Sequence, residues 1–266
     1  MRIQVWIALS LCWLFPGQQA AAMPEPPQCS HITASGHPDY PPFSWRNGEE
    51  IVGTSADLIR DAADRLGIPI TIKYSGHWKR VITRLQKNEL DLVVALYKDD
   101  LRGQKLAYGP AIVTDPVGLF VSGSSPSMGS DWSILAGKRG AIVHGEVFGA
   151  ALDKNIQTLP RLRRADDISA LLRLVELARV DFIIHGEYPV LAALHKQHSQ
   201  TTLRKVATIG KEPSYFAMAP ASPCKYLIEP LAAEIEKIKA DAPLQQKIHA
   251  DFERWTGMPS TSLGSP

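Results

Sequence analysis

Apolar residues recur at helical spacing in several parts of the chain. Between positions 54 and 66, apolar side chains return every three or four residues with charged ones between them, and Gly67 follows. This pattern predicts an amphipathic helix that ends at the glycine. The same period predicts further helices at 78–85, 168–175, 227–240 and 244–255.

Nearly continuous apolar runs separate these helices. The runs at 90–96 and 180–184 are rich in Leu, Val and Ile, which is typical of strands buried on both faces of a parallel sheet. Each run follows a helical pattern and carries an aspartate at a matching place, Asp91 and Asp181. This repeated plan predicts two α/β lobes, and one large sheet with two ordinary units is the alternative. Other strands are predicted at 68–74, 111–121, 141–143 and 215–219.

Two of the extended runs are placed to connect the lobes. The run at 111–121 precedes a loop rich in Gly, Ser and Pro, and the run at 215–219 precedes the last two helices. If those helices return to the first lobe, that lobe is discontinuous. The resulting division places the first lobe at 23–112 and 213–258, the second lobe at 113–212, and a flexible tail at 259–266.

Residues 1–22 differ from the rest of the chain. Arg2 gives a positive start, the stretch 3–15 is almost wholly apolar, and small residues fill 20–22. The apolar stretch is shorter than the about 20 residues that a membrane-spanning helix needs. The pattern predicts a signal peptide cleaved before Met23 and a periplasmic mature protein, with an uncleaved anchor or a lipoprotein as alternatives.

The composition sets broad limits on function. The chain has 266 residues, of which 45% are hydrophobic and 21% charged, so it can bury a core and has room for two domains. A formal net charge of +2 gives no reason to expect nucleic acid as a partner. The sequence lacks both a phosphate-binding loop ending in Lys-Ser or Lys-Thr and a Gly-x-Ser-x-Gly elbow, which disfavours NTPases and serine hydrolases.

Four histidines lie near predicted strand ends and bring a metal site or an enzyme into consideration. They are His37, His77, His144 and His185. Their spacing matches no compact ligand motif, so histidines scattered over loops are the simpler interpretation. The sequence therefore predicts neither a bound metal nor another cofactor.

An ordered series of residues resembles the family 3 extracellular solute-binding proteins. The series begins at 40–43 with Tyr-Pro-Pro-Phe, continues through Trp78 and 90–92, and is dense up to Arg102. Proteins of that family are periplasmic receptors for polar amino acids and supply ABC importers. The resemblance implies a two-lobed periplasmic binding protein fold, with two α/β lobes joined by two hinge strands and a ligand held between them.

The resemblance also implies ligand-binding residues in the first lobe, at strand ends. Tyr40 and Trp78 could sandwich an apolar or cationic ligand, although aromatic residues there often only seal a lobe. Arg102 lies near the place of the family's carboxylate-binding arginine, and a surface arginine is the alternative. Tyr97 is a further candidate in the stretch 95–98, which lacks the hydroxyl-bearing Ser and Thr residues of the family.

The second lobe departs further from the family pattern. Where that family has Gly followed by Ser or Thr, this chain has Gly145 followed by Glu146. The family's acid for an amino group would fall on Gly186, with Glu187 one position later. Glu146 and Glu187 are thus candidate ligand-binding residues, with a helix-terminus charge and a solvated loop residue as the respective alternatives.

These departures bear on the charge of the ligand. Two carboxylates opposite two aromatic rings favour a cationic amine or a modified amino acid. The competing interpretation is that Arg102 pairs with Glu146 across the cleft, which would leave a weakly charged ligand.

Two cysteines remain outside the leader, Cys29 and Cys224. An even pair in an oxidising compartment favours a disulfide, whereas free thiols and metal binding are the alternatives. The bridge would tie the start of the mature chain to its returning C-terminal segment.

The combined interpretation is a monomeric binding protein, not an enzyme. It would capture a small polar ligand, an amino acid or related amine, for an ABC importer. One alternative is a sensor that presents its bound state to a membrane receptor, so an ABC permease or a membrane sensor is the expected partner. The other is an enzyme similar to cyclohexadienyl dehydratases, in which Glu146 or Glu187 would act as the acid.

Overall fold

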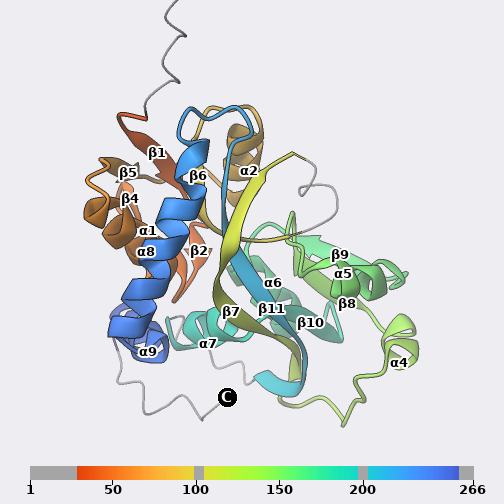
Figure 1. Cartoon of the computed structure of the whole chain (residues 1–266). Helices are drawn as coiled ribbons and strands as arrows, with labels where there is room; N and C mark the ends of the chain where they lie inside the picture. Colours follow the sequence, from red (N-terminus) through yellow and green to blue (C-terminus); the bar gives the residue numbers. More distant parts are fainter. Residues whose placement is uncertain (1–28, 99–104, 197–202, 258–266) are drawn as a thin grey trace, which may run out of the picture.

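The fold is α/β with two lobes, and one mixed sheet runs through both of them. The computed structural model describes residues 29–98, 105–196 and 203–257 (Figure 1). Within these residues the main sheet has eight strands in the order β5-β1-β6-β11-β7-β10-β8-β9. Arg102, the signal peptide at 1–22 and the tail at 259–266 lie outside the described residues.

The first lobe combines one end of this sheet with a small antiparallel sheet of β2, β3 and β4. In the main sheet, β1 pairs in parallel with β5 and β6. The elements of this lobe are β1 (Ile32–Ser35), β2 (Asp39–Tyr40), β3 (Ser44–Asn47), β4 (Glu50–Val52), α1 (Thr54–Arg65), β5 (Ile70–Ile72), α2 (Trp78–Gln86) and β6 (Leu92–Tyr97).

The second lobe is built on the other end of the sheet. Here β8 pairs in parallel with β9 and β10. The elements are α4 (Trp132–Ala136), β8 (Gly140–Val143), α5 (Ala150–Gln157), β9 (Leu162–Ala165), α6 (Ile168–Glu176), β10 (Phe182–Gly186) and α7 (Glu187–Lys196).

Two long antiparallel strands join the lobes, β7 (Ala107–Ser122) and β11 (Leu203–Met218). Figure 1 shows them side by side between the two groups of elements. β11 pairs with β6 of the first lobe near its end, and β7 pairs with β10 of the second lobe. β11 begins well before the predicted strand at 215–219. Its first half mixes apolar and charged residues of intermediate burial and has no continuous apolar run, so its hydrogen bonds to β7 define it as a strand.

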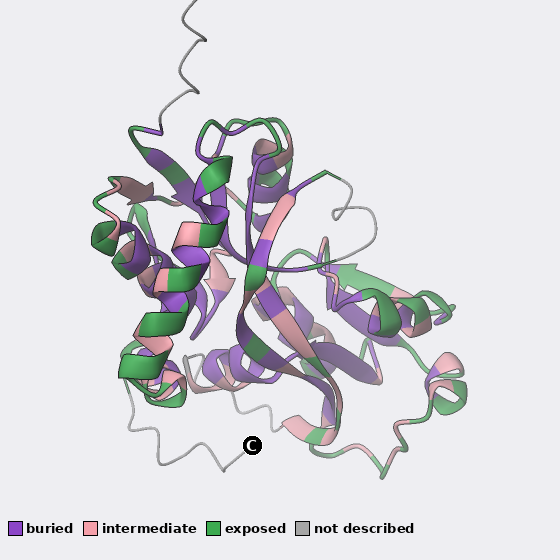
Figure 2. Cartoon of the chain, in the orientation of Figure 1, coloured by how far each residue is buried: buried purple, intermediate pink, exposed green. Residues whose placement is uncertain are grey.

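The C-terminal helices return to the first lobe, as expected. α8 (Ile228–Asp241) follows a short 3-10 turn (Lys225–Leu227) and packs on α1. α9 (Leu244–Thr256) contacts α1 and also α7 of the second lobe. Figure 2 shows the outer faces of the helices exposed and much of the long strand β11 of intermediate burial, whereas β6 and β10 are buried along their whole length. Among the described residues, no helix has the length and apolarity needed to cross a bilayer.

The two aspartates of the repeated pattern make equivalent hydrogen bonds to a neighbouring strand in the two lobes. Asp91 Oδ2 accepts a hydrogen bond from the backbone N–H of Thr33 at 2.9 Å, and the N–H of Asp91 donates to the carbonyl of Thr33. Asp181 Oδ2 accepts from the N–H of Arg139 at 2.8 Å, and the N–H of Asp181 donates to the carbonyl of Arg139. Each aspartate therefore ties the start of its strand to the start of the neighbouring one.

The structure contains the disulfide between Cys29 and Cys224, with a Cα–Cα distance of 4.8 Å. Both cysteines are buried in the apolar cluster of the first lobe, together with residues of β1 and α8. The bridge therefore fixes the start of the described chain to the returning C-terminal segment.

Candidate functional site

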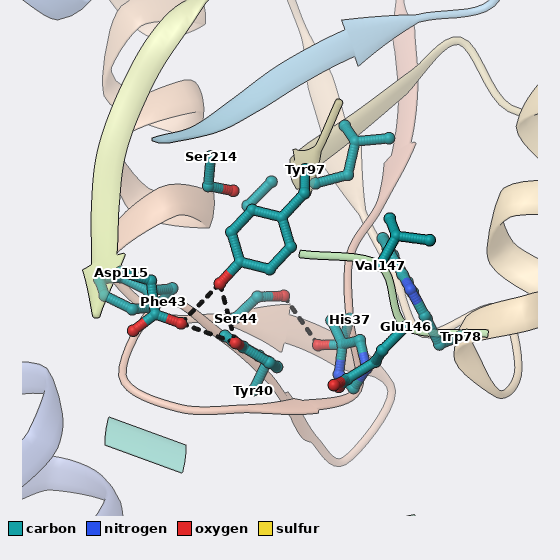
Figure 3. A pocket seen from close by; sticks show the side chains of 12 residues that line it. His37, Tyr40, Phe43, Ser44, Trp78, Tyr97, Asp115, Glu146, Val147 and Ser214 are labelled. Atoms are coloured by element: carbon teal, nitrogen blue, oxygen red, sulfur yellow. Dashed lines mark hydrogen bonds and ion pairs between the residues drawn. The ribbon is translucent and has the colours of Figure 1, made fainter. Parts of the chain in front are cut away.

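A small cavity lies between the lobes, where β2, β6, β7 and the loop after β8 meet (Figure 3). Its volume is about 40 Å³, which is room for a few water molecules because one water needs about 10–15 Å³. The lining contains four aromatic residues of the Phe, Tyr and Trp type and two carboxylates, and among the described lining residues none is Lys or Arg. The lining residues are His37, Tyr40, Phe43, Ser44, Trp78, Ala95, Leu96, Tyr97, Asp115, Glu146, Val147 and Ser214.

One carboxylate of the cavity, Asp115, is held by two tyrosines. Asp115 is 0% exposed, midway along β7. Its Oδ2 accepts hydrogen bonds from the hydroxyls of Tyr40 and Tyr97, each at 2.6 Å, and the two hydroxyl oxygens lie 2.9 Å apart. Its Oδ1 is buried and has no hydrogen-bond partner within the described part of the chain.

The surroundings shift the proton equilibria of this cluster. Burial raises the pKa of Asp115 to about 7, although the hydrogen bonds from Tyr40 and Tyr97 act in the opposite direction. Burial, and then the charge of Asp115, also raise the pKa of both tyrosines well above the ordinary value. Both hydroxyls therefore keep their protons at neutral pH.

The second carboxylate, Glu146, lies between two histidines. It is buried in the loop after β8, with Oε1 at 3.2 Å from Nε2 of His185 and 3.8 Å from Nε2 of His37. Burial lowers the pKa of His185, but the charge and hydrogen bond of Glu146, together with the charge of Asp115 and the carbonyl of Gly186, outweigh it, so the pKa of His185 is raised. The Tyr40 ring stacks on His185, with centroids 5.4 Å apart and planes inclined by 24°.

Side chains from both lobes and from the hinge meet in this cluster. Tyr40 and Tyr97 belong to the first lobe, Glu146 and His185 to the second, and Asp115 to the connecting strand. The approach of the lobes is close at Gly186, where a Cβ atom would overlap Tyr40 Oη and Asp115 Oδ2. A glycine is needed here because there is no room for a side chain.

Four of the residues predicted from sequence line the cavity: Tyr40, Trp78, Tyr97 and Glu146. Glu187 does not line it, and it begins α7 instead of lying in a loop. Its carboxylate accepts hydrogen bonds from Lys205 Nζ at 2.8 Å and from the Thr208 hydroxyl. The role of all these residues in ligand binding stays a prediction.

The sequence interpretation did not include Asp115. A signal was present, because Asp115 is an acid within an otherwise largely apolar predicted strand, and acids are almost never fully buried without a partner. His37 and His185 were considered only as scattered loop histidines, whereas His185 lies on β10 and both contact Glu146.

A larger cavity of about 580 Å³ shares Glu146, His37 and Trp78 with the small one. Its lining includes His37, His77, His144 and His185, together with Asp166 and Asp167. Despite this composition, no group of three or more His, Cys, Asp or Glu side chains in the described ranges is arranged to hold a metal ion.

Residues 32–256 match the sequence profile of the bacterial extracellular solute-binding proteins, family 3. No curated protein matches the chain in sequence.

Solved structures share the fold at low sequence identity. A histidine kinase sensor domain with similarity to periplasmic binding proteins has a TM-score of 0.71 and 16% identity, and the match covers 86% of this chain and 97% of that one. The substrate-binding protein AbpA of an amino acid ABC transporter from Streptococcus pneumoniae, bound to L-arginine, has a TM-score of 0.71 and 20% identity, with coverage of 85% and 96%. A mutant of ArgBP from T. maritima has a TM-score of 0.68 and 18% identity, with coverage of 86% and 96%.

Proposed function

Because the chain belongs to the bacterial extracellular solute-binding proteins, family 3, we propose that it captures a small polar ligand between its lobes for an ABC importer. The observation that carries this proposal is the cavity, whose lining comes from both lobes and from the connecting strand. A ligand held there contacts both lobes at once and stabilises the closed arrangement over the open one.

The lining favours a cationic ligand, an amine or a modified amino acid. Tyr40 and Trp78 present aromatic rings and Asp115 and Glu146 present carboxylates, with no Lys or Arg among the described lining residues. An aromatic face stabilises a cation by about 0.5–2 kcal/mol. We propose that Tyr40, Trp78, Tyr97 and Glu146 contact the ligand, and that Arg102 receives a ligand carboxylate where one is present.

The proposal for Glu187 is conditional. Its carboxylate is engaged by Lys205 and Thr208, so it reaches the ligand only if those hydrogen bonds break when the lobes move.

The size of the cavity indicates that binding involves motion. At about 40 Å³ the cavity is much smaller than the about 150 Å³ that holds a benzene molecule in an engineered protein. A ligand of amino-acid size therefore requires the lobes to lie further apart than they do in this conformation.

We place the mature protein in the periplasm as a monomer, after cleavage of residues 1–22. The family is extracellular, and the Cys29–Cys224 disulfide fits an oxidising compartment. The fold likeness to a histidine kinase sensor domain supports a second candidate function, in which the ligand-bound form is read by a membrane sensor.

A thermal-shift screen tests the proposal most directly. Purified mature protein would be heated with cationic amines, basic, neutral and acidic amino acids, and prephenate or arogenate. A ligand at 100 times its dissociation constant adds about 2.7 kcal/mol to the free energy of unfolding. We expect stabilisation by cationic members of the set, without consumption of any of them.

Two results would contradict the proposed function. No stabilisation by any compound would argue against a binding protein, and product formation from prephenate or arogenate would favour the enzyme that resembles cyclohexadienyl dehydratases. Deleting an adjacent permease or sensor gene and measuring ligand uptake separates transport from sensing.

A further inference from the structure

Among the residues that the structure describes, no cationic side chain is hydrogen-bonded to the buried carboxylate of Asp115. Its described hydrogen-bond partners are the hydroxyls of Tyr40 and Tyr97, which are neutral, and both bind the same oxygen. Taking a charged carboxylate out of water is costly unless it is paired. The charge of the nearby His185 lowers the pKa of Asp115 but does not offset burial, so Asp115 is either protonated or open to a further positive partner, which a ligand can supply.

The hydrogen-bond donors and acceptors around Asp115 determine which chemical group can bind there. Each tyrosine hydroxyl has one proton to donate, and Tyr40 and Tyr97 both direct theirs at Oδ2 of Asp115. Asp115 lines the cavity, its Oδ1 has no described hydrogen-bond partner, and the two hydroxyl oxygens keep their lone pairs. With Asp115 ionised, these oxygen atoms are all hydrogen-bond acceptors, so their complement is a group rich in N–H donors.

We propose that Asp115 is the carboxylate that binds the cationic group of the ligand, an ammonium, amidinium or guanidinium, and that Tyr40 and Tyr97 position it. The inference rests on the proposed function of the cavity and adds the residue that selects the ligand. With Asp115 ionised, a ligand carboxylate or phosphate is repelled from this part of the cavity, because it would face a second negative charge and oxygen lone pairs with no proton between them.

The second lobe leaves room for this arrangement by having no side chain at Gly186. A Cβ atom there would overlap both Asp115 Oδ2 and Tyr40 Oη. An acid at position 186 and the Asp115–Tyr40 pair cannot occupy the same space, so the anchoring carboxylate comes from the hinge strand β7. A cation bound to Asp115 then contacts the element that bends when the lobes close.

Binding of a cation to Asp115 is coupled to the release of a proton from its carboxyl group. Asp115 has a pKa of about 7 in the ligand-free protein, and a bound cation favours its ionised form. The titratable groups facing it are Tyr40 and Tyr97 from the first lobe, and His185 and Glu146 from the second, with His37 beyond Glu146. Affinity for a cation should fall by about tenfold per pH unit below pH 7, because a proton must leave Asp115 first.

Isothermal titration calorimetry with three defined probes tests the inference. L-arginine carries both charges, agmatine has the cation without the carboxylate, and L-glutamate is anionic. We expect wild-type protein to bind agmatine or L-arginine and not L-glutamate. At pH 6, titrations in two buffers of different ionisation enthalpy should show release of about one proton per cation bound.

The key variant is Asp115→Asn, which keeps an oxygen to accept the tyrosine hydrogen bonds. We expect it to weaken binding of the cationic probe by about 100-fold, since truncating a buried charge pair leaves the other charge unpaired, and to abolish proton release. Asp251→Asn is the matched control, because Asp251 is also buried and also accepts from a hydroxyl, that of Thr54 at 2.7 Å, but does not line the cavity. Its affinity should stay within twofold of wild type.

Tyr40→Phe and Tyr97→Phe test the positioning role. Each removes one hydrogen bond that favours the ionised form of Asp115, so the pH midpoint of binding should move upward, a shift that the loss of a ligand contact alone would not produce.

The inference is overturned if Asp115→Asn binds the cationic probe as wild type does, or if wild type prefers L-glutamate. Failure of every compound in the thermal-shift screen would instead overturn the proposed function, and this inference with it. A melting curve for Asp115→Asn establishes that lost binding is not lost folding.

Discussion

Replacing Asp115 by Asn should make the ligand-free protein more stable, and increasingly so as the pH rises. Folding raises the pKa of Asp115 from 3.8 to about 7, so the folded state binds its proton more tightly than the unfolded state does. The contribution of this group to stability is therefore lost as the pH rises from about 4 through 7. Above pH 7 the buried charge costs about 4 kcal/mol, at about 1.4 kcal/mol per pKa unit.

The pH dependence of this cost determines the pH values at which stability should be compared. At pH 8 nearly the whole cost applies, whereas at pH 5 only about 1.5 kcal/mol of it does, because Asp115 is then protonated in the folded state. The stability difference between Asp115→Asn and wild type should therefore grow by about 3 kcal/mol from pH 5 to pH 8. Comparing the two proteins at each pH cancels any constant effect of the substitution and the titration of groups that Asp115 does not influence; His185 is not among these, because Asp115 raises its pKa.

Urea denaturation of both proteins at pH 5, 6, 7 and 8 measures this difference. In thermal melts, 1 kcal/mol corresponds to about 2–4 °C for a protein of this size, so the gap in Tm should widen by roughly 10 °C. A difference that does not change with pH would mean that Asp115 titrates as it does in water, and it would refute the account of a buried, unpaired carboxylate.

Three further predictions concern the disulfide, the lobe contact and the second acid. Replacing Cys29 and Cys224 together by Ser should lower the free energy of unfolding by about 4–5 kcal/mol in the chain-entropy model, since the bridge closes a sequence separation of 195 residues; an unchanged denaturation midpoint would contradict this. Gly186→Ala should impair lobe closure and ligand binding because its Cβ overlaps Tyr40 and Asp115, whereas wild-type affinity and unchanged compaction in small-angle scattering would show that the contact is unimportant. Glu146→Gln should lower the pKa of His185, because it removes a charge that raises it, and it should weaken binding of a cation. NMR titration measures the pKa of His185 and calorimetry measures the affinity. Tight binding of glutamate that the substitution does not affect would show that Glu146 points away from the ligand.

Much of the architecture could be predicted from the sequence because periodic burial determines it. The apolar stripe of α1 and the aspartates Asp91 and Asp181 indicated helix-and-strand units in two lobes, and the resemblance supplied their arrangement. β11 was predicted too short, since a strand of intermediate burial bonded to a long neighbour needs no apolar pattern of its own.

The site was only partly predictable. Tyr40, Trp78, Tyr97 and Glu146 line one cavity, and their positions near strand ends had indicated this. Glu187 looked equivalent to Glu146 in the sequence, yet its carboxylate bonds to Lys205 and Thr208, which lie on a strand distant in the chain. Sequence alone did not indicate that partner.

Asp115 marks the boundary between what sequence determines and what tertiary structure decides. The sequence determined that an acid interrupts an apolar strand, a local fact about residue order. Its pKa and its hydrogen-bonding capacity depend on three features of the tertiary structure. Asp115 is buried, two hydroxyls from β2 and β6 donate hydrogen bonds to one of its oxygens, and a glycine in β10 has no Cβ atom that would overlap it. Such properties belong to a group of residues far apart in the chain, because desolvation and hydrogen bonding depend on which atoms are adjacent in space.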